Sequence, residues 1–333
     1  MSNNLHQAAE RGDTKTVGDL LDAGASVDAK DGHGWTPLLR AVKGGSREAV
    51  ELLLAYGAGL HTRTPGGFNA LHVAVKAGYP ELVALLIERG VELDHCNDVG
   101  ITPVKLAVIR NQAQSLLQLL EAGADPNRGI GSLNPLVGAV TLRRRELARL
   151  LLEHGADPNM PDDSGMGPLA FATASGDLET AELLLEHGAD PNGNGAETPP
   201  LLTAVCMGNA KGVRLLVSRG AVSRPQGAAM SALSMATVPG KEEILAILQA
   251  SEGTNLHQAA MDGRLHELSW LLESGDIDRC DEHGQTALIC ACKAGQSAAA
   301  GLLLDRGADH SAVDQYAMSA LLHAAAGGHA TTV

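Results

Sequence analysis

The sequence is poor in aromatic residues, in cysteine and in long apolar runs. Only seven of its 333 residues are Trp, Tyr or Phe, so the 44% apolar content must pack mainly through Leu, Ala and Val. No uninterrupted apolar run approaches the roughly 18 residues that a membrane span needs. Residues 1–4 lack the basic and apolar regions of a secretory signal. Five irregularly placed cysteines, an odd number, argue against a disulfide framework and favour a reduced, cytoplasmic protein.

Common catalytic motifs are also missing. There is no H-E-x-x-H, G-x-S-x-G, Walker-type G-x-x-x-x-G-K or C-x-x-C pattern. The best metal candidates are Cys280, His283, Cys290 and Cys292. Cys290 and Cys292 lie two positions apart, so on a helix their side chains diverge by about 200° and are poorly placed for one ion. The sequence therefore predicts no enzyme activity, no metal site and no cofactor.

Positive charge is scarce, because 25 Lys and Arg face 39 Asp and Glu, for a net charge of −14. We therefore expect neither a nucleic-acid nor a membrane partner. Residues 251–333 hold four basic and eleven acidic residues, so they carry half of the net charge. This acidic end is either a well-solvated surface or a region that steers a basic partner.

One phrase recurs along the chain. It reads T-P-L-L-R-A-V at residues 36–42 and N-A-L-H-V-A-V at residues 69–75, which lie 33 positions later. Aligned on its first residue, the phrase begins eleven times, at Asn3, Thr36, Asn69, Thr102, Asn134, Gly167, Pro199, Ser231, Thr254, Thr286 and Ser319. The steps are 32 or 33 residues, except for one of 23 residues. A period of this length indicates a stacked repeat architecture.

Each copy of the phrase predicts a pair of short helices. Thr36 suits a helix N-cap, and Pro37 suits the first helical position, where a missing N–H costs nothing. Gly45 then breaks the first helix and turns the chain. A second helix is expected from Arg47 to Tyr56, and Gly57 is the residue that best tolerates the left-handed position after it. One such pair cannot bury its apolar face alone, so the copies must stack.

The period and the T-P-L-H-x-A pattern resemble the ankyrin repeat, and the resemblance covers essentially all 333 residues. It implies an all-α solenoid of helix–turn–helix pairs with β-hairpin fingers between them. It also implies that partners are held by the fingers and by the first-helix face that lines a concave groove. In this family the His of the phrase, present here as His6, His72 and His257, serves local hydrogen bonding.

The 23-residue step divides the predicted array. We expect residues 1–250 to form repeats one to eight, with a polar N-terminal cap, and residues 251–333 to form repeats nine to eleven. About ten residues of finger are missing before Thr254. Either a fresh block is hinged on the first, or a short turn at residues 251–253 joins one continuous stack, which we favour. The last repeat lacks a second helix, so we expect truncation or further repeats in the parent protein.

Four arginines, Arg143, Arg144, Arg145 and Arg149, form a basic island in this acidic chain. Arg143 stands where other repeats carry Gly or Asn, so we expect a strained or rebuilt turn there. The island is either a solvated helix start or a contact for a carboxylate or phosphate group.

The position just before the phrase carries a large apolar residue in five consecutive repeats. We expect these residues, together with Phe171 behind them and Met230 further along, to form an apolar ridge that binds a partner. The ridge residues are Trp35, Phe68, Ile101, Leu133 and Met166. Five stacked fingers would span roughly 40 Å, which suits an extended peptide or a helix better than a small molecule. The alternative is that each residue packs against its neighbouring finger.

We therefore predict a monomeric protein-interaction scaffold without catalysis. Two alternatives stay open. In the first, the stack is a host-directed effector or toxin-neutralising protein that blocks an enzyme's active site. In the second, it is the substrate-recruiting arm of an enzyme whose catalytic part lies beyond Val333.

Overall fold

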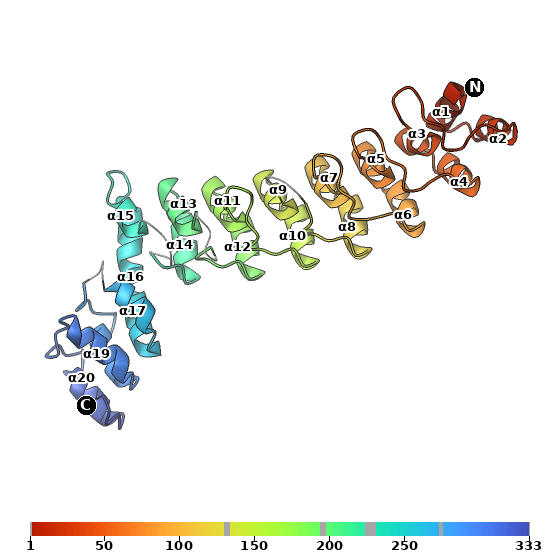
Figure 1. Cartoon of the computed structure of the whole chain (residues 1–333). Coiled ribbons are helices and arrows are strands. Elements are labelled where there is room, and N and C mark those ends of the chain that lie inside the picture. The colour runs from red at the N-terminus through yellow and green to blue at the C-terminus, as the bar shows by residue number, and fades with distance from the viewer. Residues whose placement is uncertain (1, 130–133, 194–197, 224–230, 273–275, 333) are drawn as a thin grey trace. The chain divides into compact units, whose positions relative to one another are not determined.

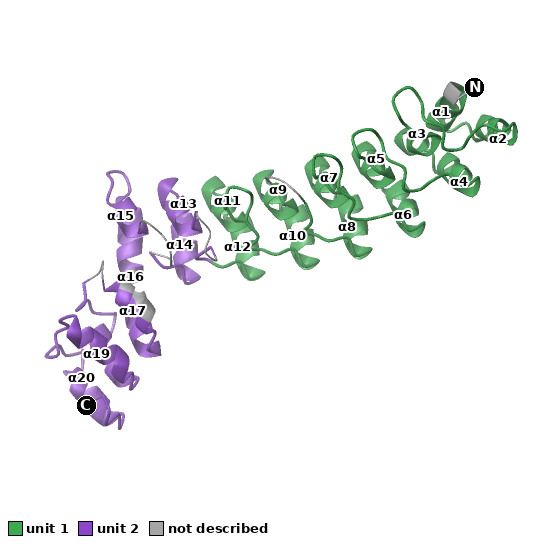
Figure 2. Cartoon of the chain, viewed as in Figure 1, with its two compact units in different colours: residues 1–190 green, residues 191–333 purple. Residues whose placement is uncertain are grey.

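The computed structural model describes residues 2–129, 134–193, 198–223, 231–272 and 276–332. The chain divides into two compact units, residues 1–190 and residues 191–333 (Figure 2). Both units are built from the predicted helix pairs, so the expected all-α solenoid is confirmed.

Unit 1 contains two rows of short helices (Figure 1). The first row holds α1 (Ser2–Arg11), α3 (Pro37–Gly44), α5 (Ala70–Ala77), α7 (Pro103–Arg110), α9 (Pro135–Thr141) and α11 (Pro168–Ser175). The second row holds α2 (Thr14–Asp22), α4 (Arg47–Ala55), α6 (Pro80–Glu88), α8 (Ala113–Glu121), α10 (Arg145–Glu153) and α12 (Leu178–Glu186). Each helix packs against its pair partner and against the next helix of its own row.

The predicted helix boundaries around α3 are confirmed. The Thr36 hydroxyl accepts a hydrogen bond from the Leu39 N–H, and Pro37 is the first helical residue. Gly45 caps the end with φ 81°, a left-handed conformation that glycine adopts without steric cost. Arg143 adopts the same conformation, with φ 54°. The substitution at this turn is therefore accommodated by a strained left-handed arginine, and the turn is not rebuilt.

The core of each pair consists of aliphatic side chains that face each other between the two rows. In the second pair, Leu38 and Val42 of α3 and Val50 and Leu53 of α4 are fully buried. Burying one such side chain contributes about 1.5–3 kcal/mol. Every pair repeats this contribution, and stability therefore grows along the stack and does not depend on one central core.

Unit 2 continues with α13 (Pro200–Cys206), α14 (Ala210–Ser218), α15 (Ala232–Ala236), α16 (Glu242–Asp262), α17 (Leu265–Leu271), α18 (Ala287–Lys293), α19 (Ser297–Asp305) and α20 (Ala320–Ala326). A core cluster around Leu256, Leu268, Ile289 and Leu303 joins its last repeats.

Helix α16 differs from the predicted turn at residues 251–253. It runs without interruption through the 23-residue step, so one 21-residue helix serves as the second helix of one repeat and the first helix of the next. The Ser251 hydroxyl donates to the Leu248 carbonyl at 2.8 Å and does not cap a new helix. With its finger missing, the chain has no segment that reverses direction, and helix α16 packs against both α14 and α18.

Within the described ranges, β pairing is limited to one isolated antiparallel bridge between Val313 and Ser319. The described fingers thus close through single turns and not through the β-hairpin ladders that the resemblance implied. No helix in the described parts of the chain is both long enough and apolar enough to cross a membrane.

Candidate protein-binding surface

Six of the described fingers, four in unit 1 and two in unit 2, present the residue before the helix N-cap through one recurring turn. In the finger before α3, the Asp31 N–H donates to the Trp35 carbonyl at 2.9 Å. The Asp31 carboxylate accepts hydrogen bonds from the N–H groups of His33 (2.8 Å) and Trp35 (3.0 Å). The same backbone bond joins Thr64 to Phe68 at 3.0 Å. It recurs in the pairs Asn97–Ile101, Asp162–Met166, Asp281–Gln285 and Asp314–Met318. Residues at this position are therefore structurally equivalent.

Asp31 ties its turn to the helix that follows. The Arg40 Nε donates to Asp31 Oδ2 at 2.8 Å, and Arg40 Nη1 donates to Glu10 Oε2 at 3.2 Å. Burial alone would raise the pKa of Asp31, but the N–H of Trp35 and the Arg40 guanidinium outweigh it and lower the pKa below its ordinary value. The carboxylate therefore stays charged near neutral pH and holds the turn that carries Trp35.

The rings of Trp35 and Phe68 are half-buried, and each lies beneath a cation from the adjacent first helix. The Arg40 guanidinium carbon lies 5.0 Å from the Trp35 ring centroid, and Lys43 Nζ lies 5.9 Å from it. Lys76 Nζ lies 5.4 Å from the Phe68 ring centroid. These distances fall within the range of cation–π attraction. Both rings are therefore partly exposed and are contacted by at least one cation each.

A hollow of about 770 Å³ lies between these two aromatic positions. We call it the Trp35–Phe68 hollow; its lining comprises His33, Trp35, Lys43, Thr64, Pro65, Gly66, Phe68, Val73, Lys76, Ala77 and Tyr79. Two fingers and two first helices contribute to this lining, so the hollow exists only because two repeats stack. Its size falls within the range of ligand-binding clefts.

Three of the other predicted binding residues lie in the described ranges, and two lie outside them. Ile101, Met166 and Phe171 are half-buried, like Trp35 and Phe68. Leu133 and Met230 lie outside the described residues. Ridge residues in the described ranges are thus neither fully exposed nor packed away, and their role in binding stays a prediction.

Comparison with known families agrees with this architecture. The family model for ankyrin repeats in three copies matches residues 5–97, 67–130, 104–195, 136–227, 238–314 and 256–333. The chain belongs to the ankyrin-repeat family. A search of curated proteins gives no match. Among solved structures, an ankyrin repeat domain from Acinetobacter baumannii AYE is similar, with 27% identity and a TM-score of 0.53; the match covers 55% of this chain and 97% of that domain. Ankyrin repeats are in general protein–protein interaction modules.

The lysines above the aromatic rings were not singled out by sequence reasoning. Lys43 and Lys76 each follow the first residue of the ankyrin phrase by seven positions, and so does Lys293. Lys293 Nζ lies 3.5 Å from Oε1 of Gln285, which occupies the Trp35 position of its own repeat. The shared seven-residue spacing of these lysines is visible in the sequence, but only the structure shows that each lysine lies beside the residue that precedes its phrase.

The predicted basic island contacts neighbouring ankyrin repeats. Arg143 Nη2 donates to the Ser175 carbonyl at 2.7 Å, and Arg144 donates to the Val108 carbonyl. Arg145 Nη2 lies 3.1 Å from Asp177 Oδ1 and 3.2 Å from Glu179 Oε2, and the fourth member, Arg149, is exposed on α10. An external anion would compete with these internal carboxylates for Arg145. Binding of an anionic group at the island stays a prediction.

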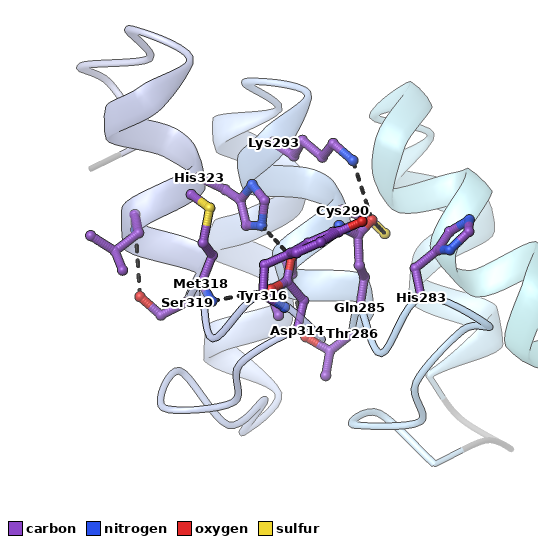
Figure 3. Close-up of polar contacts among 12 residues, drawn as sticks. His283, Gln285, Thr286, Cys290, Lys293, Asp314, Tyr316, Met318, Ser319 and His323 are labelled. Carbon is purple, nitrogen blue, oxygen red and sulfur yellow. Dashed lines mark hydrogen bonds and ion pairs between the residues drawn. The ribbon is translucent and has the colours of Figure 1, made fainter.

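The finger before α20, in unit 2, contains a side-chain arrangement similar to that of Asp31 and Arg40 (Figure 3). Asp314 Oδ1 accepts from the N–H groups of Tyr316 (2.9 Å) and Met318 (3.1 Å), and Asp314 Oδ2 lies 2.8 Å from His323 Nε2. Burial would raise the pKa of Asp314, but these hydrogen bonds, led by that of His323, lower it well below its ordinary value. His323 follows Asp314 by nine residues, as Arg40 follows Asp31, so an Asp in each finger contacts a side chain of the following helix, an arginine in one and a histidine in the other.

The cysteine and histidine candidates for a metal site differ in their exposure to solvent. Cys290 and Cys292 are buried on α18, whereas Cys280 and His283 are exposed. Burial raises the pKa of the Cys290 thiol to about 12, so it carries no thiolate near neutral pH. In the described ranges, no group of three or more His, Cys, Asp and Glu could hold one ion.

Proposed function

We propose that this ankyrin-repeat protein is a scaffold that binds a partner protein along its fingers and first-helix face, without catalysis. The observation that carries the proposal is the Trp35–Phe68 hollow, whose two rings are half-buried and aligned by equivalent turns. Aromatic side chains that are held rigidly and left partly open are the residues most often found at the centre of protein interfaces.

The recurrence of half-buried apolar residues favours a protein partner over a small molecule. Ile101 and Met166 occupy the Trp35 position in later repeats of unit 1. An extended peptide or a helix can contact several such positions at once, whereas a compact ligand can fill only one hollow. The five free thiols support a cytoplasmic location for this scaffold, where thiols remain reduced, and we propose that it acts as a monomer.

The double variant Trp35→Ala/Phe68→Ala tests the proposal. The chain is immobilised and the proteins that it retains from a lysate of the source cells are identified by mass spectrometry. Partners that bind the wild type should be lost or weakened at least a hundredfold with the double variant, because two interface anchors contribute several kcal/mol together. Tyr56→Ala is the matched control, since Tyr56 is a 41% exposed aromatic residue outside the hollow, at the end of α4.

Stability measurements separate a binding role from a packing role. Fully buried rings would cost about 3–5 kcal/mol each on replacement by Ala. Because Trp35 and Phe68 are half-buried, we expect about half of that cost for each. Retained partners in spite of a severe loss of stability would show that the rings are architectural, and the proposal would be refuted.

A further inference from the structure

We propose that the Trp35–Phe68 hollow receives an apolar side chain from an acidic peptide segment of the partner, with carboxylates beside Lys43 and Lys76. This inference rests on the proposed function and specifies the chemistry of the segment that is bound. The charged residues that line the hollow are the two lysines, and no Asp or Glu is among the lining residues. This is a local reversal of sign in a chain of net charge −14.

Lys43 and Lys76 differ in how freely each can pair with a carboxylate of the partner. Lys43 Nζ lies 2.7 Å from Glu10 Oε1, but Glu10 is shared with Arg40, whose Nη1 lies 3.2 Å from Glu10 Oε2. Lys76 is exposed, and it forms no ion pair with any residue in the described ranges. A carboxylate beside Lys76 would therefore meet a cation that no anion of the described ranges pairs with, and one beside Lys43 would share a cation with Glu10.

The positions of the lysines define a spacing for the partner's carboxylates. Lys43 on α3 and Lys76 on α5 occupy equivalent places in consecutive repeats. Stacked helices lie about 8–10 Å apart. A segment in the extended polyproline II conformation advances about 3.1 Å per residue with three residues per turn, so two carboxylates three residues apart lie on one face, about 9 Å from each other, and match this separation. An apolar side chain between them points to another side of the segment, and there it can face the Trp35 and Phe68 rings on the fingers while the carboxylates face the lysines on the first helices.

A nucleic acid is the competing occupant, because bases also stack on aromatic rings beside cations. The observations favour the peptide for two reasons. A strand of phosphates needs a basic groove along its length, whereas this hollow offers two lysines in an acidic chain. In addition, the cations already cover one side of each ring, which leaves the rings better suited to an apolar side chain than to a continuous base stack.

The probe is a library of 12-residue peptides with Glu at positions 5 and 8, Phe or Leu at position 6, and Gly or Ser elsewhere. Matched libraries replace both Glu by Lys or by Gln, and a 12-nucleotide single-stranded oligothymidylate is the nucleic-acid probe. Binding is followed by tryptophan emission in a Trp270→Phe background, in which Trp35 is the one remaining tryptophan. We expect the Glu library to shift the emission and to bind about tenfold more tightly than the Lys library.

Reversing the charge of Lys76 distinguishes a binding role of this lysine from a structural role. Lys76→Glu should weaken binding of the Glu library by about tenfold and should strengthen binding of the Lys library. Lys211→Glu on α14 changes the net charge by the same amount at an exposed site outside the hollow, and it should leave both affinities unchanged.

Three results would overturn the inference: equal binding of the Glu, Gln and Lys libraries, preferential binding of the oligothymidylate, or no binding by any probe. Equal binding of the peptide libraries that is lost in Trp35→Ala/Phe68→Ala would leave the proposed surface intact and remove only its preference for acidic segments. Because this variant lacks the Trp35 reporter, its binding is measured by the fluorescence anisotropy of fluorescein-labelled peptides. Retention of cellular partners by that double variant would instead refute the proposed function.

Discussion

The His72 ring should resist protonation until the pH is well below its ordinary range. His72 is fully buried in α5, and its Nε2 lies 2.8 Å from the Ile101 carbonyl. Burial lowers the pKa of His72 to about 4, from an ordinary value of 6.5, although the Ile101 carbonyl favours the charged form. The ring thus links the α5 repeat to the next finger as a neutral imidazole.

The lowered pKa of His72 makes the free energy of unfolding depend on pH. The unfolded chain takes up a proton below about pH 6.5, whereas the folded chain refuses it until about pH 4. Stability contributed by the neutral ring is therefore fully present above pH 6.5, falls as the pH drops towards 4, and then stays constant. At 1.36 kcal/mol per pKa unit the full loss is about 3 kcal/mol, with about 2 kcal/mol already lost at pH 5.

Two measurements check this prediction. NMR titration of the full chain with ¹³C-labelled histidine should show the His72 ring titrating near pH 4. Urea unfolding, followed by Trp35 emission in the Trp270→Phe background, should show a stability loss between pH 7.5 and pH 5 that shrinks in His72→Gln. His33→Gln, at an exposed finger position, should keep the wild-type pH dependence.

One result would refute the reasoning. Nδ1 of His72 lies 2.7 Å from Asn69 Oδ1, so both ring nitrogens face oxygen acceptors, and only the charged imidazolium can donate to both. A His72 pKa above 6.5 would mean that these two hydrogen bonds outweigh the cost of burial. The α5 repeat would then gain stability on acidification, which is the opposite of our prediction.

Two further predictions concern single residues. Gly44→Ala should destabilise unit 1 by about 2 kcal/mol or more, because a Cβ there would meet the Glu10 carbonyl oxygen far inside van der Waals contact. Gly18→Ala, on helix α2 with open space around it, should instead stabilise the chain by about 0.5–1 kcal/mol. Thermal melts of the two variants check both predictions. Asp314→Asn should lower the melting temperature of unit 2 near neutral pH, because it weakens the bond from His323. Since the pKa of Asp314 is lowered well below 3.8 on folding, the difference from wild type should be fully present above about pH 3.8 and should shrink steadily as the pH falls below that value towards the folded pKa; a difference that stays constant would contradict this.

The repeat period and cap chemistry could be predicted from the sequence because both are local. Thr36 caps its helix through a hydrogen bond within four residues, and Gly45 and Arg143 are left-handed because their place in the phrase requires it. The continuous helix α16 could not be predicted in this way. Ser251 and Gly253 are typical of helix ends, but deletion of the finger joined two helices that would each have ended there.

The candidate site depended on contacts between repeats, which the phrase alone does not contain. Trp35 and Phe68 could be identified as unusual residues at a shared position, but not as exposed or packed. Lys43 and Lys76, which lie one helical turn or more along the next helix, are placed over these rings, and this contact is visible only in the structure. Ile101 and Met166 are also half-buried, but Ile109 and Ala174 stand at the lysine position of their repeats, so a large apolar residue is combined with a lysine at Trp35 and Phe68. The first two described fingers of unit 1 thus bring apolar and positive side chains together, and for this reason we propose a partner segment that offers both an apolar and an acidic side chain.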